Sequence, residues 1–258
     1  MKRTKSNFSL YIVIALLIVV LLAIYTYRLF SKNIEIEGFD IKQNIDYYVI
    51  TMREESRMKN IESQIKKSGI QMNMNYIDAV VGKHLDIDEY IAHNKISPNI
   101  YANEGKKFAD KFDNRKNEVG CYLSHMKTYQ TIKERGHTDK YSVIFEDDFS
   151  LSDDFAKVLE ETLDKIAHLD FDMLFLGMSG ETGKQVVDNV YFTVPYSFQT
   201  HGYLVNNKHI DKIISEMQYI DNIVDVQIFK KADEGRLTVL RLQPTIVFQA
   251  DYGSSIRK

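Results

Sequence analysis

The chain has 258 residues, of which 44% are hydrophobic and 27% charged, with 12 glycines, 3 prolines and one cysteine. This composition excludes collagen-like, low-complexity and largely disordered chains, and a single cysteine excludes a scaffold held by disulfides within the chain. The first 30 positions hold four basic residues and no acid, which leaves the remainder with 29 basic and 36 acidic side chains, a net charge of −7. Because so acidic a body binds polyanions poorly, we expect no nucleic-acid partner.

The amino-terminal segment is apolar and long enough to span a membrane. No charged residue occurs from Ser6 to Tyr27, which is 22 residues. A helix of that length extends about 33 Å, and the hydrocarbon core of a bilayer is about 30 Å thick. The basic residues before this run favour a cytoplasmic amino terminus, and Tyr25 and Tyr27 lie where an interfacial aromatic belt would be.

A cleaved signal peptide is the alternative to a membrane anchor. The apolar run exceeds the roughly 7–15 residues of a signal-peptide core, and no small-residue cleavage site follows it. We therefore predict a single-pass type II membrane protein, with a cytoplasmic tail over 1–9, a transmembrane signal-anchor over 10–30 and a stem over 31–44. It would face the Golgi or endoplasmic-reticulum lumen in a eukaryote, or belong to a bacterial envelope or a virus.

The elements predicted after the stem begin with a buried strand over 46–51. A helix over 54–67 follows, ended by Gly69, and then a second strand over 73–79. Residues 82–117 are rich in Lys, Asn and Asp and lack a clear period, which predicts an excursion from the core with a short helix near 86–93. A further helix begins at Glu118, with an apolar face of Val119, Tyr122, Leu123 and Met126.

The second half of the chain continues the alternation of strands and helices. Buried strands are predicted over 141–145 and 172–177, and strand character over 237–248. Ser152 or Asp153 caps a helix, and Asn207 caps another. The apolar positions of these two helices fit helical spacing: Phe155, Val158, Leu159, Leu163, Ile166 and Leu169 in the first, and Ile210, Ile213, Ile214 and Met217 in the second. The alternation predicts one α/β domain over 45–258, a sheet with helices on its faces.

Three consecutive acids, Glu146, Asp147 and Asp148, follow directly after the strand over 141–145. In open α/β sheets, ligands bind outside the carboxyl ends of the strands. Adjacent carboxylates repel one another, and Mg²⁺ or Mn²⁺ is a natural counter-charge. In an extended chain Glu146 and Asp148 would share one side. The alternative is an acidic loop that leads into the first turn of a helix, where acids are common.

A second motif lies in the helix from Glu118. Gly120 and Cys121 are small enough to let a ligand or another backbone approach closely, and Ser124 and His125 could face that ligand. Two alternatives stay open. The segment could be a tightly packed helix with a hydrogen-bonded histidine, or Cys121 could be a nucleophile with His125 as its base at i+4. The sequence has no glycine-rich nucleotide-binding loop and no Cys/His cluster with zinc spacing.

Six segments, in order along the chain, resemble glycosyltransferase family 25, which includes bacterial lipo-oligosaccharide galactosyltransferases and collagen β-galactosyltransferase domains. The resemblance runs from about residue 46 to 256 and departs from the family at Met52 and Arg53, which replace Leu-Asp, and in the Lys/Asn-rich loop after Gly82. The segments are residues 47–57, 77–82, 118–125, 143–148, 200–205 and a carboxy-terminal group of Val224, Asp225, Gln249 and 254–256.

This resemblance implies a GT-A-like nucleotide-sugar-binding sheet flanked by helices. The implied reaction transfers a hexose, galactose or glucose, from a UDP-sugar donor to a hydroxyl of a glycan or protein acceptor, with inversion. Glu146 and Asp148 would hold Mn²⁺ or Mg²⁺, and Asp147 would bind the metal or the donor's ribose. Asp225 is the implied general base, with a helix N-cap as its alternative role.

The residues implied to bind the donor come from several segments of the resemblance. They are Arg57, Asp78, Gly82, Ser124, His125, Gln249 and Ser255, with His201 and Asp251 as further metal or phosphate contacts. Two other functions remain alternatives. One is a non-catalytic, membrane-tethered glycosyltransferase-like binding module. The other is a phosphohydrolase or nucleotidyltransferase, which would need more metal ligands and a phosphate-binding glycine loop.

Overall fold

The computed structural model describes residues 44–98, 112–195 and 197–250, together with residues 16, 18–20 and 22. The chain divides into two compact units, Met1–Gly38 and Phe39–Lys258. In the first unit the five described residues are helical and exposed. Within the described parts of the chain, no helix is both long and apolar enough to cross a membrane. The predicted tail, most of the signal-anchor and all of the stem except residue 44 lie outside the described residues, as do Asp251 and Ser255.

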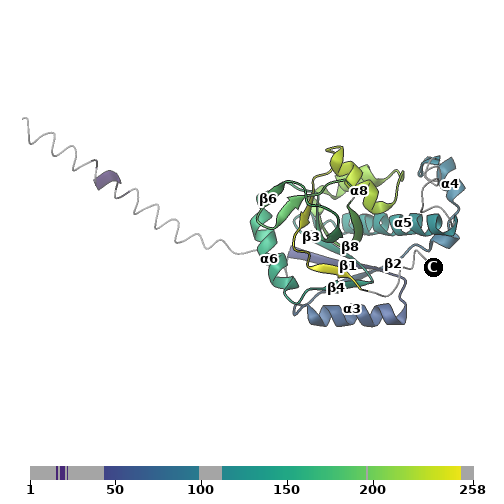
Figure 1. The fold of residues 1–258 in the computed structure, drawn as a ribbon, viewed down its shortest axis with the longest axis horizontal. Helices are drawn as coiled ribbons and strands as arrows, with labels where there is room; N and C mark the ends of the chain where they lie inside the picture. The colour runs from purple at the N-terminus through teal and green to yellow at the C-terminus, as the bar shows by residue number, and fades with distance from the viewer. Residues whose placement is uncertain are drawn as a thin grey trace, which may run out of the picture. The chain divides into compact units, whose positions relative to one another are not determined.

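The described part of the second unit is built on a mixed eight-stranded sheet flanked by helices, as the predicted α/β class requires (Figure 1). The strand order is β2-β1-β3-β8-β5-β9-β7-β6. β2, β1 and β3 are parallel, whereas β8 is antiparallel to both β3 and β5. The strands are β1 Ile45–Thr51, β2 Met74–Asp78, β3 Tyr141–Glu146, β5 Met173–Ser179, β6 Gln185–Val187, β7 Val190–Phe192, β8 Phe198–Asn206 and β9 Val239–Leu242. A separate antiparallel pair consists of β4 Phe149–Leu151 and β10 Val247–Gln249.

Helices cover both faces of the sheet, and β1 shows how. Tyr47 and Val49 pack in one core cluster with residues of α3 and α6, whereas Tyr48 and Ile50 pack in the other with residues of α5, α7 and α8. Burial on both faces explains why the central strands are continuous apolar runs. The helices are α3 Glu55–Lys67, α4 Ile87–Ala92, α5 Phe112–Arg135, α6 Phe155–Ile166, α7 Ile210–Met217 and α8 Val224–Asp233, with 3₁₀ turns η1 Gly82–His84 and η3 Asn207–His209.

Most of the predicted elements are confirmed, but the strand predicted over 237–248 is two strands, β9 in the main sheet and β10 in the separate pair with β4. The other corrections concern where helices begin. α5 starts at Phe112, six residues before the predicted start at Glu118, because its first turns are polar and carry no apolar period. Ser152 and Asp153 do not cap α6. The N-cap position is Asp154, without a side-chain cap bond, because the backbone of Ser152 is held by Ile246 beside the β4–β10 pair.

The second capping prediction is also wrong by one residue. Asn207 lies inside η3, and the side chain of Asn206 accepts the capping hydrogen bond from the backbone of Lys208. The predicted end of α3 is confirmed, since Gly69 has a φ of 71° just after the helix. β8 and the β6–β7 hairpin have no counterpart among the predicted elements.

Two glycines let β10 cross closely over the central strands. A Cβ atom on Gly177 of β5 would lie 1.9 Å from the carbonyl oxygen of Val247, and one on Gly202 of β8 would lie 2.4 Å from the Val247 side chain. Neither strand could carry a side chain there without displacing β10. These glycines therefore fix the path that brings Gln249 to the end of β3.

Candidate active site

A cavity of about 310 Å³ lies where β1, β2 and β3 end. Because these strands are parallel, their carboxyl ends meet at one edge of the sheet, which is where open α/β sheets bind ligands. The three consecutive acids at the end of β3 line this cavity. Four other residues proposed from the sequence line it too: Gly82, Ser124, His125 and Gln249.

The acidic segment does not continue as an extended chain. Residues 147 and 148 form a turn directly after Glu146 ends β3, so the prediction that Glu146 and Asp148 share one side of an extended chain is wrong. The turn gives the carboxylates different partners. Asp147 and Asp148 face Arg57 of α3, and Glu146 faces His125 of α5.

Arg57 is the counter-charge for the turn. Its side chain is 5% exposed, and Nη1 lies 3.4 Å from Asp147 Oδ1 and 3.3 Å from Asp148 Oδ2. Burial raises the pKa of both carboxyls above the ordinary value, and the negative charge of Glu146 raises the pKa of Asp148 further. The guanidinium opposes this rise and favours the ionised forms. The negative charge of the turn is thus largely buried, and Arg57 neutralises part of it.

A polar stripe on α3 holds the segment that follows the turn. Asn60 Nδ2 donates to the carbonyl oxygen of Phe149 over 2.9 Å, and Gln64 Oε1 accepts from the backbone of Leu151, also over 2.9 Å. Neither side chain was singled out in the sequence. The spacing of Arg57, Asn60 and Gln64 at i, i+3 and i+7 is the signal that could have found them, because it places three polar residues on one helix face.

Glu146 is held by two groups from different elements. Thr200 Oγ1 of β8 donates a hydrogen bond of 2.5 Å to Glu146 Oε1, and His125 Nε2 lies 3.4 Å from the same oxygen. Burial works against ionisation of this carboxyl. The interaction with His125 at 3.4 Å, helped by the hydrogen bond from Thr200, outweighs burial and holds the pKa of Glu146 below its ordinary value. Thr200 was not among the functional residues predicted from the sequence.

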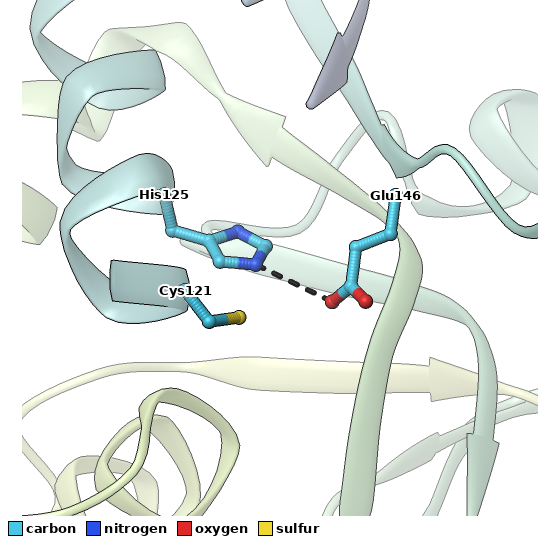
Figure 2. A group of neighbouring side chains, drawn as sticks. All are labelled: Cys121, His125 and Glu146. Atoms are coloured by element: carbon cyan, nitrogen blue, oxygen red, sulfur yellow. Dashed lines mark ion pairs between the residues drawn. The ribbon is translucent and has the colours of Figure 1, made fainter. Parts of the chain in front are cut away.

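Cys121 and His125 lie one turn apart on α5 and project toward Glu146 (Figure 2). One ligand atom from each of the three residues lies within 4.8 Å of the others. Burial raises the pKa of the Cys121 thiol well above its ordinary value, and the nearby acids add to this rise. A thiol that resists ionisation is a poor nucleophile, which argues against Cys121 as a nucleophile.

Ser124, Gly120 and Gly82 join α5 to the loop after β2. Ser124 Oγ donates to the carbonyl oxygen of Gly120 over 2.7 Å and accepts from the backbone of Val80 over 2.8 Å. A Cβ atom on Gly120 would lie 2.6 Å from the Val80 oxygen and 2.9 Å from the Gly82 Cα. The small residues of this motif therefore allow another segment of backbone to pack closely against α5. The sequence analysis predicted close approach of either a ligand or another backbone.

Asp225 is linked to the acidic turn through two glutamines. Its Oδ2 accepts from the backbone of Gln199 over 3.0 Å, and Gln199 Nε2 donates to Gln249 Oε1 over 3.3 Å. Gln249 Nε2 in turn donates to Asp148 Oδ2 over 3.1 Å. Asp225 lies in the first turn of α8, whose N-cap is Ile223, so the alternative of an N-cap role is wrong. Burial raises the pKa of Asp225, against hydrogen bonds from the backbone.

Four described residues that were proposed from the sequence do not line the cavity: Arg57, Asp78, His201 and Asp225. Asp78 is 66% exposed and pairs with Arg53 over 2.5 Å, which lowers its pKa through that hydrogen bond and the positive charge. His201 is buried, with Nε2 3.2 Å from the carbonyl oxygen of Val247. Neither residue lines the cavity as the described residues form it. Asp225 is connected to the cavity through Gln199, which bonds to Gln249 of the lining.

Comparison with known proteins agrees with the resemblance inferred from the sequence. Procollagen galactosyltransferase 1-B of Xenopus laevis is 30% identical over 156 residues, which cover 57% of this chain and 24% of that protein. Procollagen galactosyltransferase 1 of Danio rerio is 25% identical over 197 residues, which cover 72% of this chain and 30% of that protein. A Mus musculus protein named inactive glycosyltransferase 25 family member 3 is 31% identical over 100 residues, which cover 34% of this chain and 17% of that protein.

The chain spans about a quarter of the length of the first of these relatives. The family model described as glycosyltransferase family 25 (LPS biosynthesis protein) matches residues 44–228, which include β1, the acidic turn, α5 and Asp225. This match covers well over half of the chain, and we conclude that the chain belongs to glycosyltransferase family 25.

Proposed function

We propose that the chain is a GT-A-like, metal-assisted glycosyltransferase that moves a hexose, galactose or glucose, from a UDP-sugar to a hydroxyl of a glycan or protein, with inversion. One observation carries the proposal: the acidic end of β3 lines a cavity at the carboxyl edge of three parallel strands. Nucleotide ligands of open α/β sheets bind at such an edge. The galactosyltransferase names of the relatives support the choice of galactose.

The donor set suits a hard divalent cation. Asp148 Oδ1 is buried and has no hydrogen-bond partner among the described residues. Carboxylate oxygens are the ligands that Mg²⁺ and Mn²⁺ prefer. We propose that Glu146 and Asp148 hold the cation, with Asp147 on the cation or the donor's ribose. The cation would neutralise charge on the diphosphate leaving group.

The chain's own residues would position the reactants and move one proton. Inversion by single displacement needs a base that takes the proton of the acceptor hydroxyl, and Asp225 is our candidate. Its raised pKa brings it nearer to the working range of a general base. Arg57 favours the ionised forms of Asp147 and Asp148, and Ser124 holds the loop after β2 that lines the cavity.

A donor screen tests this proposal. The full chain is incubated with a panel of nucleotide sugars, with and without Mn²⁺, and the release of the nucleoside diphosphate is measured. We expect release from a UDP-hexose only with Mn²⁺ or Mg²⁺. Asp148→Asn should abolish it, whereas Asp188→Asn, a matched change at an exposed turn acid, should leave it intact. Metal-independent release, or full activity in Asp148→Asn, would contradict the proposal.

We also propose that residues 10–30 anchor the chain in a membrane as a type II signal-anchor. The support is the uncharged run of 22 residues and the basic residues before it. Carbonate extraction of membranes that carry the full-length chain tests this. Retention in the membrane pellet is expected, and release into the supernatant would contradict it.

A non-catalytic, membrane-tethered binding module is the second candidate function, and two observations favour it. Arg57 and His125 balance the acidic turn without any ligand, so the three acids alone do not demand a cation. One relative carries the name of an inactive family member. Binding of a UDP-sugar without release of UDP, across the whole donor panel, would favour this function.

A further inference from the structure

Cys121, His125 and Glu146 form a cluster whose ligand chemistry differs from that of the acidic turn. The turn offers only carboxylate oxygens, whereas this cluster offers one sulfur, one imidazole nitrogen and one carboxylate oxygen, all within 4.8 Å of one another (Figure 2). A mixed sulfur, nitrogen and oxygen set selects zinc over the hard cations Mg²⁺ and Mn²⁺. The cluster therefore offers a set of metal ligands that the proposed hexose transfer does not require.

The imidazole of His125 is poised for a ligand. Its side chain is fully buried, and among the described residues Nε2 makes no hydrogen bond and faces Glu146 Oε1 over 3.4 Å. Nδ1 lies 2.8 Å from Tyr203 Oη, which lies 2.8 Å from Tyr129 Oη. A metal-bound histidine usually uses its second nitrogen in this way, because that hydrogen bond fixes the tautomer and the ring orientation.

The distances and the burial also suit zinc. In a tetrahedral zinc site, neighbouring ligand atoms lie about 3.3–3.6 Å apart, as the usual zinc–ligand bond lengths require. His125 Nε2 lies 3.4 Å from Glu146 Oε1, and the sulfur belongs to the same helix face as His125. All three residues line the cavity, so a fourth coordination position would open toward it.

We propose that Cys121, His125 and Glu146 form a zinc site with one open position toward the cavity. Binding breaks the S–H bond of Cys121, sends the proton to solvent and forms a zinc–thiolate bond, with no change of oxidation state. Glu146 would then be a zinc ligand, although the proposed function has the same residue bind the cation of the donor. On that proposed function, zinc and Mn²⁺ compete for one carboxylate, and zinc inhibits transfer.

Cobalt(II) is the probe, because a thiolate bound to cobalt gives a charge-transfer absorption that carboxylates and imidazoles do not. Cys121 is the chain's single cysteine, so every such signal comes from it. We expect the full chain to develop this absorption with cobalt and to lose it when zinc is added. Cys121→Ser should abolish it, and His168→Gln, at an exposed histidine, should retain it. Tyr203→Phe should weaken zinc binding about 10- to 100-fold, the usual effect of removing the hydrogen-bond partner of a metal-bound histidine.

Alkylation of the wild-type thiol by iodoacetamide keeps the test independent of folding in the variants. Zinc should slow this alkylation about tenfold or more, whereas Mn²⁺ should not, because thiolate favours zinc over Mn²⁺. Absence of the cobalt–thiolate absorption, or an alkylation rate that zinc leaves unchanged, would overturn the zinc site. Both readouts are independent of transfer. A failed donor screen beside a positive cobalt result would refute the proposed function alone.

Discussion

Replacement of Arg57 by Met tests whether the acidic turn depends on its buried counter-charge. Met keeps much of the side-chain length and removes the charge, which leaves Asp147 and Asp148 facing apolar atoms. Removing one partner of a buried ion pair costs about 3–5 kcal/mol. The distances of 3.3 and 3.4 Å exceed the roughly 2.7–2.9 Å of the strongest charge-assisted bonds, so we expect the lower end, about 3 kcal/mol.

The assay is urea unfolding of the full chain at neutral pH, followed by circular dichroism. Lys59→Met is the matched control on the same helix. Lys59 pairs with Glu55 in solvent, with side chains 71% and 83% exposed, and such pairs contribute about 0.5 kcal/mol or less. A loss below about 1 kcal/mol for Arg57→Met, or a loss equal to that of Lys59→Met, would refute the assignment of Arg57 as the counter-charge.

The stability loss of Arg57→Met should also depend on pH. A loss caused only by a cavity would not. Because the pKa values of Asp147 and Asp148 are raised, the folded protein binds their protons at a higher pH than the unfolded chain does. Acidification between the unfolded and the folded pKa therefore stabilises the folded state. Without Arg57 these pKa values rise further, so the deficit of Arg57→Met should shrink as the pH falls from the raised folded pKa values of the variant to those of the wild type. A deficit that is constant with pH would contradict this.

Three further predictions concern α5, the core and the proposed base. Gly120→Ala should lower stability by about 1–3 kcal/mol, because the added Cβ would lie 2.6 Å from the Val80 oxygen; an unchanged urea midpoint would contradict the close approach. Leu163→Ala should cost about 2–5 kcal/mol in the same assay, since Leu163 is fully buried in α6, and a cost near zero would contradict that packing. Asp225→Asn should lower kcat/KM about 10²- to 10⁴-fold and remove the acidic fall of the pH–rate profile, which the raised pKa of Asp225 places above the ordinary range of an aspartate. An unchanged profile would exclude Asp225 as the base.

The central strands could be predicted because burial on both faces leaves a simple signal. β1, β3 and β5 are apolar runs bounded by polar residues, and a strand with helices on both sides needs such a run. β8 lies between β3 and β5 and was missed, because Thr200, His201 and Gly202 interrupt its apolar pattern. Thr200 donates a hydrogen bond to Glu146, and Gly202 leaves room for Val247. The residues that obscure the strand pattern are therefore residues that shape the site.

The site could be predicted only where chemistry is concentrated in the sequence. The acids after β3 and the Ser-His pair of α5 stand out locally, and the structure brings both to one cavity. The partners of the acids come from other elements: Arg57 from α3, His125 from α5, and Gln249 from β10, 101 residues away from Asp148. No local pattern assigns Arg57 or Gln249 to Asp148. Asp78 was placed by resemblance alone, and its exposed pair with Arg53 keeps it outside the lining.

We propose that the acidic end of β3 holds a cation for a nucleotide-sugar donor. Calorimetric titration of the full chain with UDP, with and without Mn²⁺, tests it most directly, because binding needs neither an acceptor nor the correct sugar. We predict binding with Mn²⁺ and none without it, loss of binding in Asp148→Asn that still shows a cooperative melt, and retention in Asp188→Asn. UDP binding that is independent of Mn²⁺, or unchanged in Asp148→Asn, would contradict the claim.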